Sequence, residues 1–283
     1  MLFYLGTHEP SWLRHPGVSV PLFVSRRRLA RLACLGPGRP LTRAGRSVYA
    51  ARVRWACDSG GFSEIAEFGE WRLPVADYVD ELRRYRDGIG LMDWAAPQDW
   101  MCEPVMLAKT GMRIAEHQAR TTLSVLELRR RLAGEDIRII PVLQGWRLDD
   151  YLRHVEQYAT AGIDLAAEPL VGVGSVCRRQ ALGEAASIIR ALAALGLRLH
   201  GFGMKGEAFA LYGAELATAD SMAWSYAGRQ RPDIKCPAAS CANCLHYALD
   251  WRTRALAGHQ GEAGTQPALP LRWRMQTETA CLR

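Results

Sequence analysis

The sequence lacks the long apolar runs of membrane proteins. Its 283 residues are 49% hydrophobic, yet no uninterrupted apolar stretch approaches the ~20 residues that span a bilayer. The first residues, MLFYLGTHEPSW, carry no basic leader and are interrupted by polar side chains, unlike a secretory signal peptide. We therefore expect a cytoplasmic globular protein with no membrane association.

Cysteine is also scarce. Eight cysteines scattered over a chain of this length are too few for a disulfide scaffold. Three of them, Cys236, Cys241 and Cys244, gather late in the chain, and a histidine follows. Thiolates at such spacing are typical of tetrahedral structural zinc in a reducing compartment. Three reduced cysteines without metal are the plain alternative.

Acidic residues are outnumbered by basic ones, 29 against 36, which gives a net charge of +7. This balance favours an anionic partner such as nucleic acid, but only weakly. Part of the excess lies in runs at 26–28, 129–131 and 178–179. Each run fits a solvated helix face equally well.

Short apolar segments bounded by Gly, Pro or Asp recur along the chain, as expected of buried parallel strands. The expected strands are Leu2–Gly6, Val20–Val24, Val53–Asp58, Ile89–Asp99, Ile137–Gln144, Leu170–Gly174, Leu197–Gly203 and Ala219–Ser225. Amphipathic stretches between them predict helices over 75–88, 121–134, 148–162 and 178–196.

The alternation of strands and helices predicts an α/β fold, a (β/α)₈ barrel of the TIM type over residues 1–235. A doubly wound open sheet is the alternative. Residues 236–283 are expected to form a small zinc-binding segment and a C-terminal tail packed on the barrel.

Polar side chains gather where the expected strands end, which is where a barrel places reactive groups. Asp58, Asp99, Gln144 and Asp220 lie at or near such ends. Asp58, in the stretch DSGG, is also typical of a turn. Asp220 could equally cap the helix that follows it.

Several of these stretches resemble one enzyme family in their order and approximate spacing. They are DSGGF (58–62), VLQGW (142–146), VGVGS (171–175), LHGFG (199–203) and the aspartate of ADSMAWSYAGR (219–229). The chain resembles the tRNA-guanine transglycosylase superfamily. PQDWMCEP (97–104) and DSMAWSYAGR (220–229) are closer to the deazapurine DNA modification protein A-like branch, which inserts 7-deazaguanine into DNA.

The resemblance implies a (β/α)₈ barrel that exchanges guanine in DNA for a 7-deazaguanine such as preQ₀. It implies DNA and a free 7-deazaguanine as partners, with helper proteins possible, in the cytoplasm of a bacterium or of a virus-infected bacterial host. Base exchange breaks the C1′–N9 bond through an oxocarbenium-like state, which a carboxylate can capture while a second carboxyl group handles the proton. By resemblance Asp220 is the nucleophile and Asp58 the general acid/base.

Base recognition is also implied by the resemblance. Guanine offers N1–H and a 2-amino group as donors and O6 as an acceptor, so its site needs a carboxylate and an amide. Asp99 aligns with the base-reading aspartate of the family, with Asp93 as a competitor. Gln144 and the backbone of Gly145 would contact O6.

Four more residues complete the implied base pocket. Gly172 and Val173 would present backbone to the base. Phe62 would stack on it, although a core aromatic is equally plausible. His200 stands where the family has an apolar residue that packs under the base.

The remaining implied sites lie beyond Asp220. Arg229, Arg231 and Lys235 are candidates for phosphate contacts, with solvated surface as the alternative. The family uses three cysteines and a later histidine for zinc, so His259 is the expected fourth ligand after Cys236, Cys241 and Cys244. His246 is the alternative, but its spacing from Cys244 is cramped.

Three other functions compete with DNA base exchange. The same chemistry on tRNA is the first, and a non-catalytic barrel subunit that binds nucleic acid is the second. Loss of the nucleophile would be expected in such a subunit, whereas Asp220 is present. An unrelated zinc-dependent hydrolase is the third, and it would need histidines at strand ends, where this sequence has carboxylates and amides.

Overall fold

The structure, a computed structural model, describes residues 1–176, 182–230 and 240–257. Its main element is a sheet of eight parallel strands in the order β6-β5-β2-β1-β10-β9-β8-β7. The strands are β1 (Leu2–Thr7), β2 (Leu22–Ser25), β5 (Trp55–Asp58), β6 (Met92–Ala95), β7 (Val142–Leu143), β8 (Val171–Val173), β9 (Leu199–Gly201) and β10 (Leu216–Ser221).

The first strand of the chain, β1, pairs with the last, β10. Leu2 lies opposite Thr218 and Leu5 opposite Ser221, in parallel register. Strand order therefore follows chain order around the sheet, as in a TIM-like fold, and does not reverse as it would in a doubly wound sheet. The parallel α/β prediction is confirmed, and the doubly wound alternative is not observed.

The edges of the sheet, β6 and β7, meet through one isolated bridge between Ala95 and Ile139. The Ala95 N–H donates to the Arg138 carbonyl at 2.8 Å, and the Ile140 N–H donates to the Ala95 carbonyl at 3.3 Å. The remaining neighbours in the sheet are joined by longer ladders.

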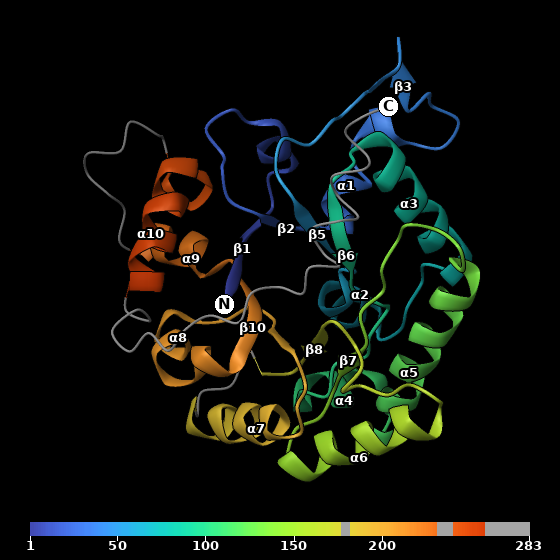
Figure 1. Ribbon diagram of the computed structural model, residues 1–283, viewed down its shortest axis with the longest axis vertical. Coiled ribbons are helices and arrows are strands. Elements are labelled where there is room, and N and C mark those ends of the chain that lie inside the picture. Colours follow the sequence, from blue (N-terminus) through green and yellow to red (C-terminus); the bar gives the residue numbers. More distant parts are fainter. Residues whose placement is uncertain (177–181, 231–239, 258–283) are drawn as a thin grey trace.

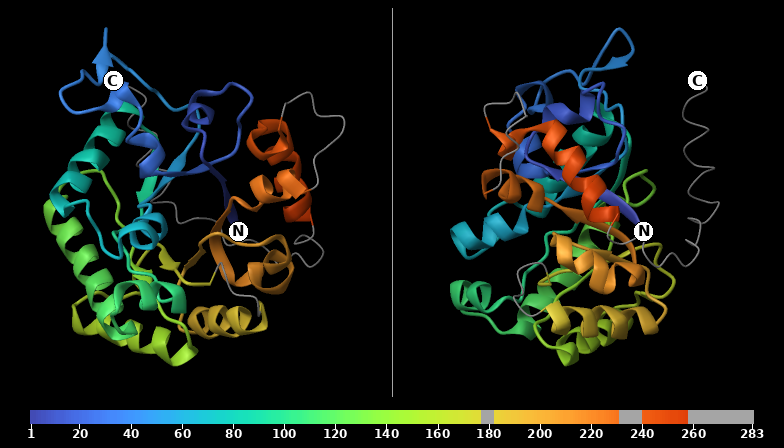
Figure 2. Two further views of the ribbon diagram at one scale, coloured as in Figure 1. Left: turned by 180° about the vertical axis from the view of Figure 1, so that it is seen from behind. Right: turned by 90° about the vertical axis from the view of Figure 1, so that its left-hand side faces the viewer.

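Helices surround the strands, as Figure 1 and the reverse view in Figure 2 show. They are α1 (Arg26–Leu29), α2 (Gly61–Phe68), α3 (Val75–Gly88), α4 (Pro104–Thr110), α5 (Ile114–Arg131), α6 (Leu148–Thr160), α7 (Leu182–Ala194), α8 (Gly206–Tyr212), α9 (Ala223–Gln230) and α10 (Leu245–Ala257). A small antiparallel hairpin, β3 (Thr42–Arg43) and β4 (Arg46–Ser47), lies outside the main sheet. None of the helices in the described ranges is long and apolar enough to cross a bilayer.

The alternation of side chains along the strands divides their apolar residues between two clusters. Phe3 and Leu5 of β1 belong to a large cluster shared with the helices. Tyr4, between them, joins a separate cluster with Phe23 and Trp94 from other strands. This pattern is that of a curved sheet with one face toward the helices and one face enclosed.

The boundaries differ from expectation where local chemistry ends an element. The expected strand 219–225 ends at Ser221 because the Ser221 hydroxyl accepts from the Ala223 N–H at 3.0 Å, and α9 begins there. The expected strand 89–99 forms only over Met92–Ala95. Pro97 follows closely, and proline cannot donate to a ladder. Helix 75–88 matches α3, whereas helix 121–134 is the later part of the longer α5.

Candidate active site

A cavity of about 620 Å³ opens at the carboxyl ends of the parallel strands. All eight strands contribute a lining residue at or just beyond that end. In strand order along the chain these residues are Thr7, Ser25, Asp58, Ala96, Gln144, Gly174, Gly203 and Asp220. The predicted concentration of polar groups at the strand ends therefore forms one continuous site.

Asp58 is the last residue of β5, and its carboxyl group faces this cavity. Burial raises the pKa of Asp58, and the nearby negative charge of Asp220 raises it further. Hydrogen bonds from the Gly60 backbone and the Ser25 side chain oppose the shift. The pKa of Asp58 is thus raised by its burial and by the second carboxylate, which is the direction that a general acid requires.

Asp220 lies near the end of β10 and is 4% exposed. Its Oδ1 accepts from the Gly203 N–H at 2.9 Å and lies 3.3 Å from the His200 Nε2. The His200 Nδ1 lies 2.7 Å from the Thr218 hydroxyl, which fixes the ring. The Gly203 N–H therefore anchors Oδ1, whereas the nearby His200 Nε2 is not aligned to form a hydrogen bond with it.

Asp99 follows β6 and anchors a polar network along the cavity wall. The Gln144 Nε2 donates to its Oδ2 at 2.6 Å, and the Ser59 hydroxyl donates to its Oδ1 at 3.2 Å. Burial, then the negative charge of Asp58, raises the pKa of Asp99 to about 7, against the hydrogen bonds. A carboxyl group that titrates near neutrality can accept from the donor edge of a purine when it is ionised.

Ser175 extends this network to a second buried carboxylate. Its Oγ lies 2.8 Å from the Gln144 Oε1 and 2.9 Å from the Glu103 Oε2, and it accepts from the Cys102 N–H at 2.8 Å. Ser175 has a φ of 57°, in the left-handed region that few non-glycine residues adopt. Such strain is typical of a backbone held in place by function.

The two glycines of DSGG allow these groups to approach. Gly60 has a φ of 78°, and a Cβ there would lie 2.9 Å from the Arg27 side chain. A Cβ on Gly61 would lie 3.1 Å from the Asp99 Oδ1. The turn after β5 is therefore present, and it also brings α2 against the carboxylates, so the turn and the site are the same feature.

The expected base-binding residues divide into two groups. Phe62, Asp99 and Gln144 line the cavity. Among the lining residues, neither Gly145 nor His200 occurs. A Cβ on Gly145 would lie 3.0 Å from the Tyr151 backbone N, so this glycine serves the packing of α6.

Gly172, Val173 and His200 are not among the cavity-lining residues. A Cβ on Gly172 would lie 2.5 Å from the Phe202 ring, so this glycine makes room for that ring, and Val173 belongs to the core shared with the helices. His200 is fully buried among aromatic rings, with Phe202 at 4.5 Å between ring centroids. Phe202 itself lines the cavity, so it takes the wall position expected of His200. Asp93, the competitor of Asp99, instead pairs with Arg54 at 2.6 Å.

The position of Arg229 does not support the phosphate contact expected of it. Arg229 is exposed on α9 and is not among the cavity-lining residues. Arg231 and Lys235 lie outside the described residues. Lining residues that the sequence reading missed include Ser25, Glu103, Ser175 and Phe202. The signal that could have found three of them is the motif around each: Ser175 ends VGVGS, Phe202 lies within LHGFG and Glu103 lies within PQDWMCEP. Ser25 lies in none of the quoted motifs.

The predicted zinc ligands are described only in part. Cys241 and Cys244 flank the turn η4 (Cys241–Asn243), and both are buried. His246 is exposed at the start of α10, and Cys236 and His259 lie outside the described residues. Within 1–176, 182–230 and 240–257 no three His, Cys, Asp or Glu side chains gather as a metal site. The zinc site therefore stays a prediction.

Comparison with known proteins extends these observations. The protein-family model described as "DpdA: DeoxyPurine in DNA protein A" matches residues 1–277, which include every cavity residue named above. No curated protein matches the chain. Among solved structures, the chain is similar to the crystal structure of 2,3-dimethylmalate lyase, a PEP mutase/isocitrate lyase superfamily member. The two are 12% identical, with 90% of this chain and 92% of that chain covered and a TM-score of 0.42.

Proposed function

This chain belongs to the DpdA (deoxypurine in DNA protein A) family, and from that membership we propose that it is a transglycosylase acting on DNA. It exchanges a guanine base for a 7-deazaguanine, such as preQ₀, through a covalent aspartyl-nucleotide intermediate. The observation that carries the proposal is the convergence of Asp58 and Asp220 on one cavity, where the charge of one raises the pKa of the other.

In the first step the Asp220 carboxylate attacks C1′ of the target nucleotide and the C1′–N9 bond breaks. The electron pair of that bond leaves with N9 of guanine, and protonated Asp58 donates the proton that N9 takes up. The buried setting that raises the pKa of Asp58 supports this role. The products of the step are free guanine, an ester between Asp220 and C1′, and ionised Asp58.

In the second step a 7-deazaguanine occupies the emptied base site. Ionised Asp58 takes its N9 proton, N9 attacks C1′, and Asp220 leaves as a carboxylate. Two displacements give net retention at C1′. The target nucleotide must leave its helical stack to reach Asp220, so an extruded or single-stranded nucleotide is the substrate.

Base recognition is assigned to the wall that Asp99 and Gln144 form. Ionised Asp99 would accept from N1–H and the 2-amino group, and the amide of Gln144 would face O6. Phe62 and Phe202 offer flat apolar surface to the ring. Three of the expected base contacts would act only by supporting this wall: Gly145, Gly172 and Val173. His200 would act through Asp220, which lies 3.3 Å from its Nε2.

Residues 236–283 are proposed to carry a structural zinc on Cys236, Cys241, Cys244 and His259. The ion would staple the chain after β10 and take no part in base exchange. The resemblance also supports two further proposals: phosphate contacts by Arg229, Arg231 and Lys235, and the action of helper proteins.

Incubation of the purified chain with preQ₀ and either duplex DNA, single-stranded DNA or tRNA tests the proposed function. Nuclease digestion and mass spectrometry should find the deazaguanine deoxynucleoside in DNA. The variant Asp220→Asn, which preserves side-chain shape, should incorporate none. Incorporation only into tRNA would overturn the choice of substrate, and equal incorporation by Asp220→Asn would overturn the mechanism. Each incubation is repeated with an extract of the host cell to supply helper proteins.

A further inference from the structure

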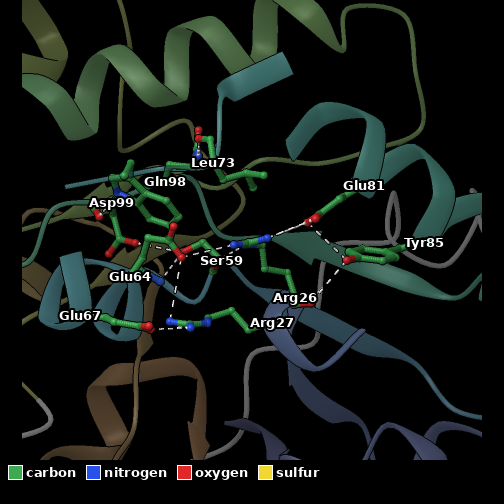
Figure 3. Close-up of polar contacts among 12 residues, drawn as sticks. Arg26, Arg27, Ser59, Glu64, Glu67, Leu73, Glu81, Tyr85, Gln98 and Asp99 are labelled. Atoms are coloured by element: carbon green, nitrogen blue, oxygen red, sulfur yellow. Dashed lines mark hydrogen bonds and ion pairs between the residues drawn. The ribbon is translucent and has the colours of Figure 1, made fainter. Parts of the chain in front are cut away.

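The three arginines at 26–28 differ in their burial and in their ion pairs. Arg26 is 7% exposed and is used within the fold. It donates to the Ser59 carbonyl at 3.1 Å and to Glu81 at 3.1 Å, and it lies 3.4 Å from Glu64 (Figure 3). Its charge is therefore neutralised inside the protein.

Arg27 is the intermediate case. It lines the cavity, and its guanidinium pairs with Glu67 at 2.7 Å and lies 4.0 Å from Glu64 (Figure 3). Its stem packs over Gly60, next to the carboxyl end of β5. Arg27 thus tethers α1 to α2 at the rim of the cavity.

Arg28 and Arg31 differ from both. They line the same cavity and are exposed. Among the residues that the structure describes, neither has an acidic partner within ion-pair distance. The Arg31 N–H donates to the Arg28 carbonyl at 3.3 Å, and residues three apart on a helical turn lie on the same side.

The charges of the cavity are arranged by depth. Asp58, Asp99, Glu103 and Asp220 are buried or half-buried in its lining, and those that are ionised repel a polyanion. Glu67 also lines the cavity, but it pairs with Arg27. The cationic Arg28 and Arg31 lie at its rim, on the α1 side. A nucleotide whose C1′ reaches Asp220 carries its flanking phosphates out past that rim, where a cation is needed to hold them.

We propose that Arg28 and Arg31 form a phosphate-binding site for the strand that carries the target nucleotide. The inference rests on the proposed function for the identity of the strand as DNA. It places these phosphate contacts beside α1, whereas Arg229, the contact expected from the sequence, lies on α9. The two guanidinium groups position the strand and carry no base specificity.

The double variant Arg28→Ala/Arg31→Ala in the full chain tests this site. Fluorescence anisotropy measures the affinity for labelled DNA and RNA oligonucleotides over a series of salt concentrations. Loss of two phosphate contacts should reduce the slope of log K against log salt by about 1.8 on duplex DNA and about 1.4 on single strands. Binding of preQ₀ alone, measured by calorimetry, should stay within about twofold of wild type, because neither arginine reads the base.

A matched control removes the same charge elsewhere. Arg43 and Arg46 are exposed on the β3–β4 hairpin and are not among the cavity-lining residues. Arg43→Ala/Arg46→Ala should leave the salt slope unchanged. Equal loss of slope in both double variants, or no loss in either, would overturn the phosphate site.

The outcome is separable from that of the proposed function. A loss of slope with RNA as great as with DNA supports the phosphate site and counts only against DNA as the strand. Wild-type protein that binds DNA through Arg28 and Arg31 but exchanges no base would likewise contradict the transglycosylase assignment while supporting the site.

Discussion

Asp99 is the carboxyl group whose state at neutral pH decides how the cavity binds a base. Its pKa, near 7, means that the empty site is a mixture of acid and carboxylate in ordinary buffers. Only the carboxylate accepts from both donors of guanine. Hydrogen bonds from Gln144 and Ser59 restrain the shift, so the same contacts that orient Asp99 keep it partly ionised.

Base affinity should therefore rise with pH. For wild type we expect preQ₀ to bind about tenfold more tightly at about pH 8 than at about pH 6, because the bound form requires ionised Asp99. Asp99→Asn should remove this rise and weaken binding at high pH by about 1–3 kcal/mol. Calorimetry at several pH values measures both, and an unchanged pH profile in Asp99→Asn would contradict the assignment.

The same substitution should have the opposite effect on stability. The folded-state pKa of Asp99 lies above its ordinary value of 3.8, so its favourable contribution is complete below about pH 4 and is lost as pH rises through about 7. Asp99→Asn should raise Tm relative to wild type at about pH 8 and leave it nearly unchanged at about pH 4. A larger gain at low pH would contradict the burial of this carboxyl group.

For single residues, the sequence was most informative about the site where the residue lies in a recognisable motif. Asp58, Asp99, Gln144 and Asp220 were predicted as site residues and meet at one cavity. Ser175 was predicted only as part of VGVGS, and its contact with Gln144 depends on a left-handed backbone that no motif specifies. Contacts made across strands are set by the fold, which is why they could not be predicted.

Among the elements, α9 and the turn η4 lie unusually close. A Cβ on Gly228 of α9 would lie 2.6 Å from the Cys241 carbonyl oxygen, so no larger residue fits without moving the turn. This contact fixes two of the predicted zinc ligands, Cys241 and Cys244, relative to the helix that follows Asp220. The sequence predicted the cysteine cluster but not the helix that supports it.

Gly228→Ala should destabilise the protein by about 1–3 kcal/mol, because the added methyl group overlaps backbone that cannot rotate away. Gly183→Ala on α7 is the matched control: a Cβ there meets nothing within 4 Å, so alanine should stabilise by up to about 1 kcal/mol. Urea denaturation of both variants measures the difference. Equal stabilisation by the two substitutions would show that α9 and η4 do not pack closely.

Helices were easier to predict than strand ends. The stripe of apolar residues in α3 defines its face and length, so 75–88 was correct to the residue. The strand β7 has only two residues, and the backbone N–H that follows it, on Gln144, donates to the His154 Nδ1 at 2.9 Å instead of to a neighbouring strand. Such endings depend on local hydrogen bonds, which an apolar pattern does not encode.

For the whole molecule, the order of strands around the sheet follows from alternating strands and helices and from right-handed crossovers. How tightly the sheet closes does not follow from them. Here the β6 and β7 edges are joined by the bridge between Ala95 and Ile139, whereas β1 and β10 pair over four positions. The weakest part of the ring is thus next to Asp99 and Gln144.

Hydrogen exchange should reveal this difference. The Ile140 amide, bonded to Ala95 at 3.3 Å, should exchange faster than the Leu5 amide, bonded to Pro21 at 2.8 Å within a continuous ladder, because opening an isolated bridge breaks fewer bonds. Exchange followed by NMR resolves both amides. Equal protection would show that the sheet closes as firmly at β6 and β7 as elsewhere.

Mass spectrometry of a trapped protein–DNA adduct tests the central claim most directly. Wild-type protein incubated with DNA and denatured during turnover should carry a nucleotide ester on the peptide that contains Asp220. Asp58→Asn should slow formation of the adduct without moving it, and Asp220→Asn should form none. An active wild-type enzyme with no adduct, or with the ester on another residue, would contradict the account.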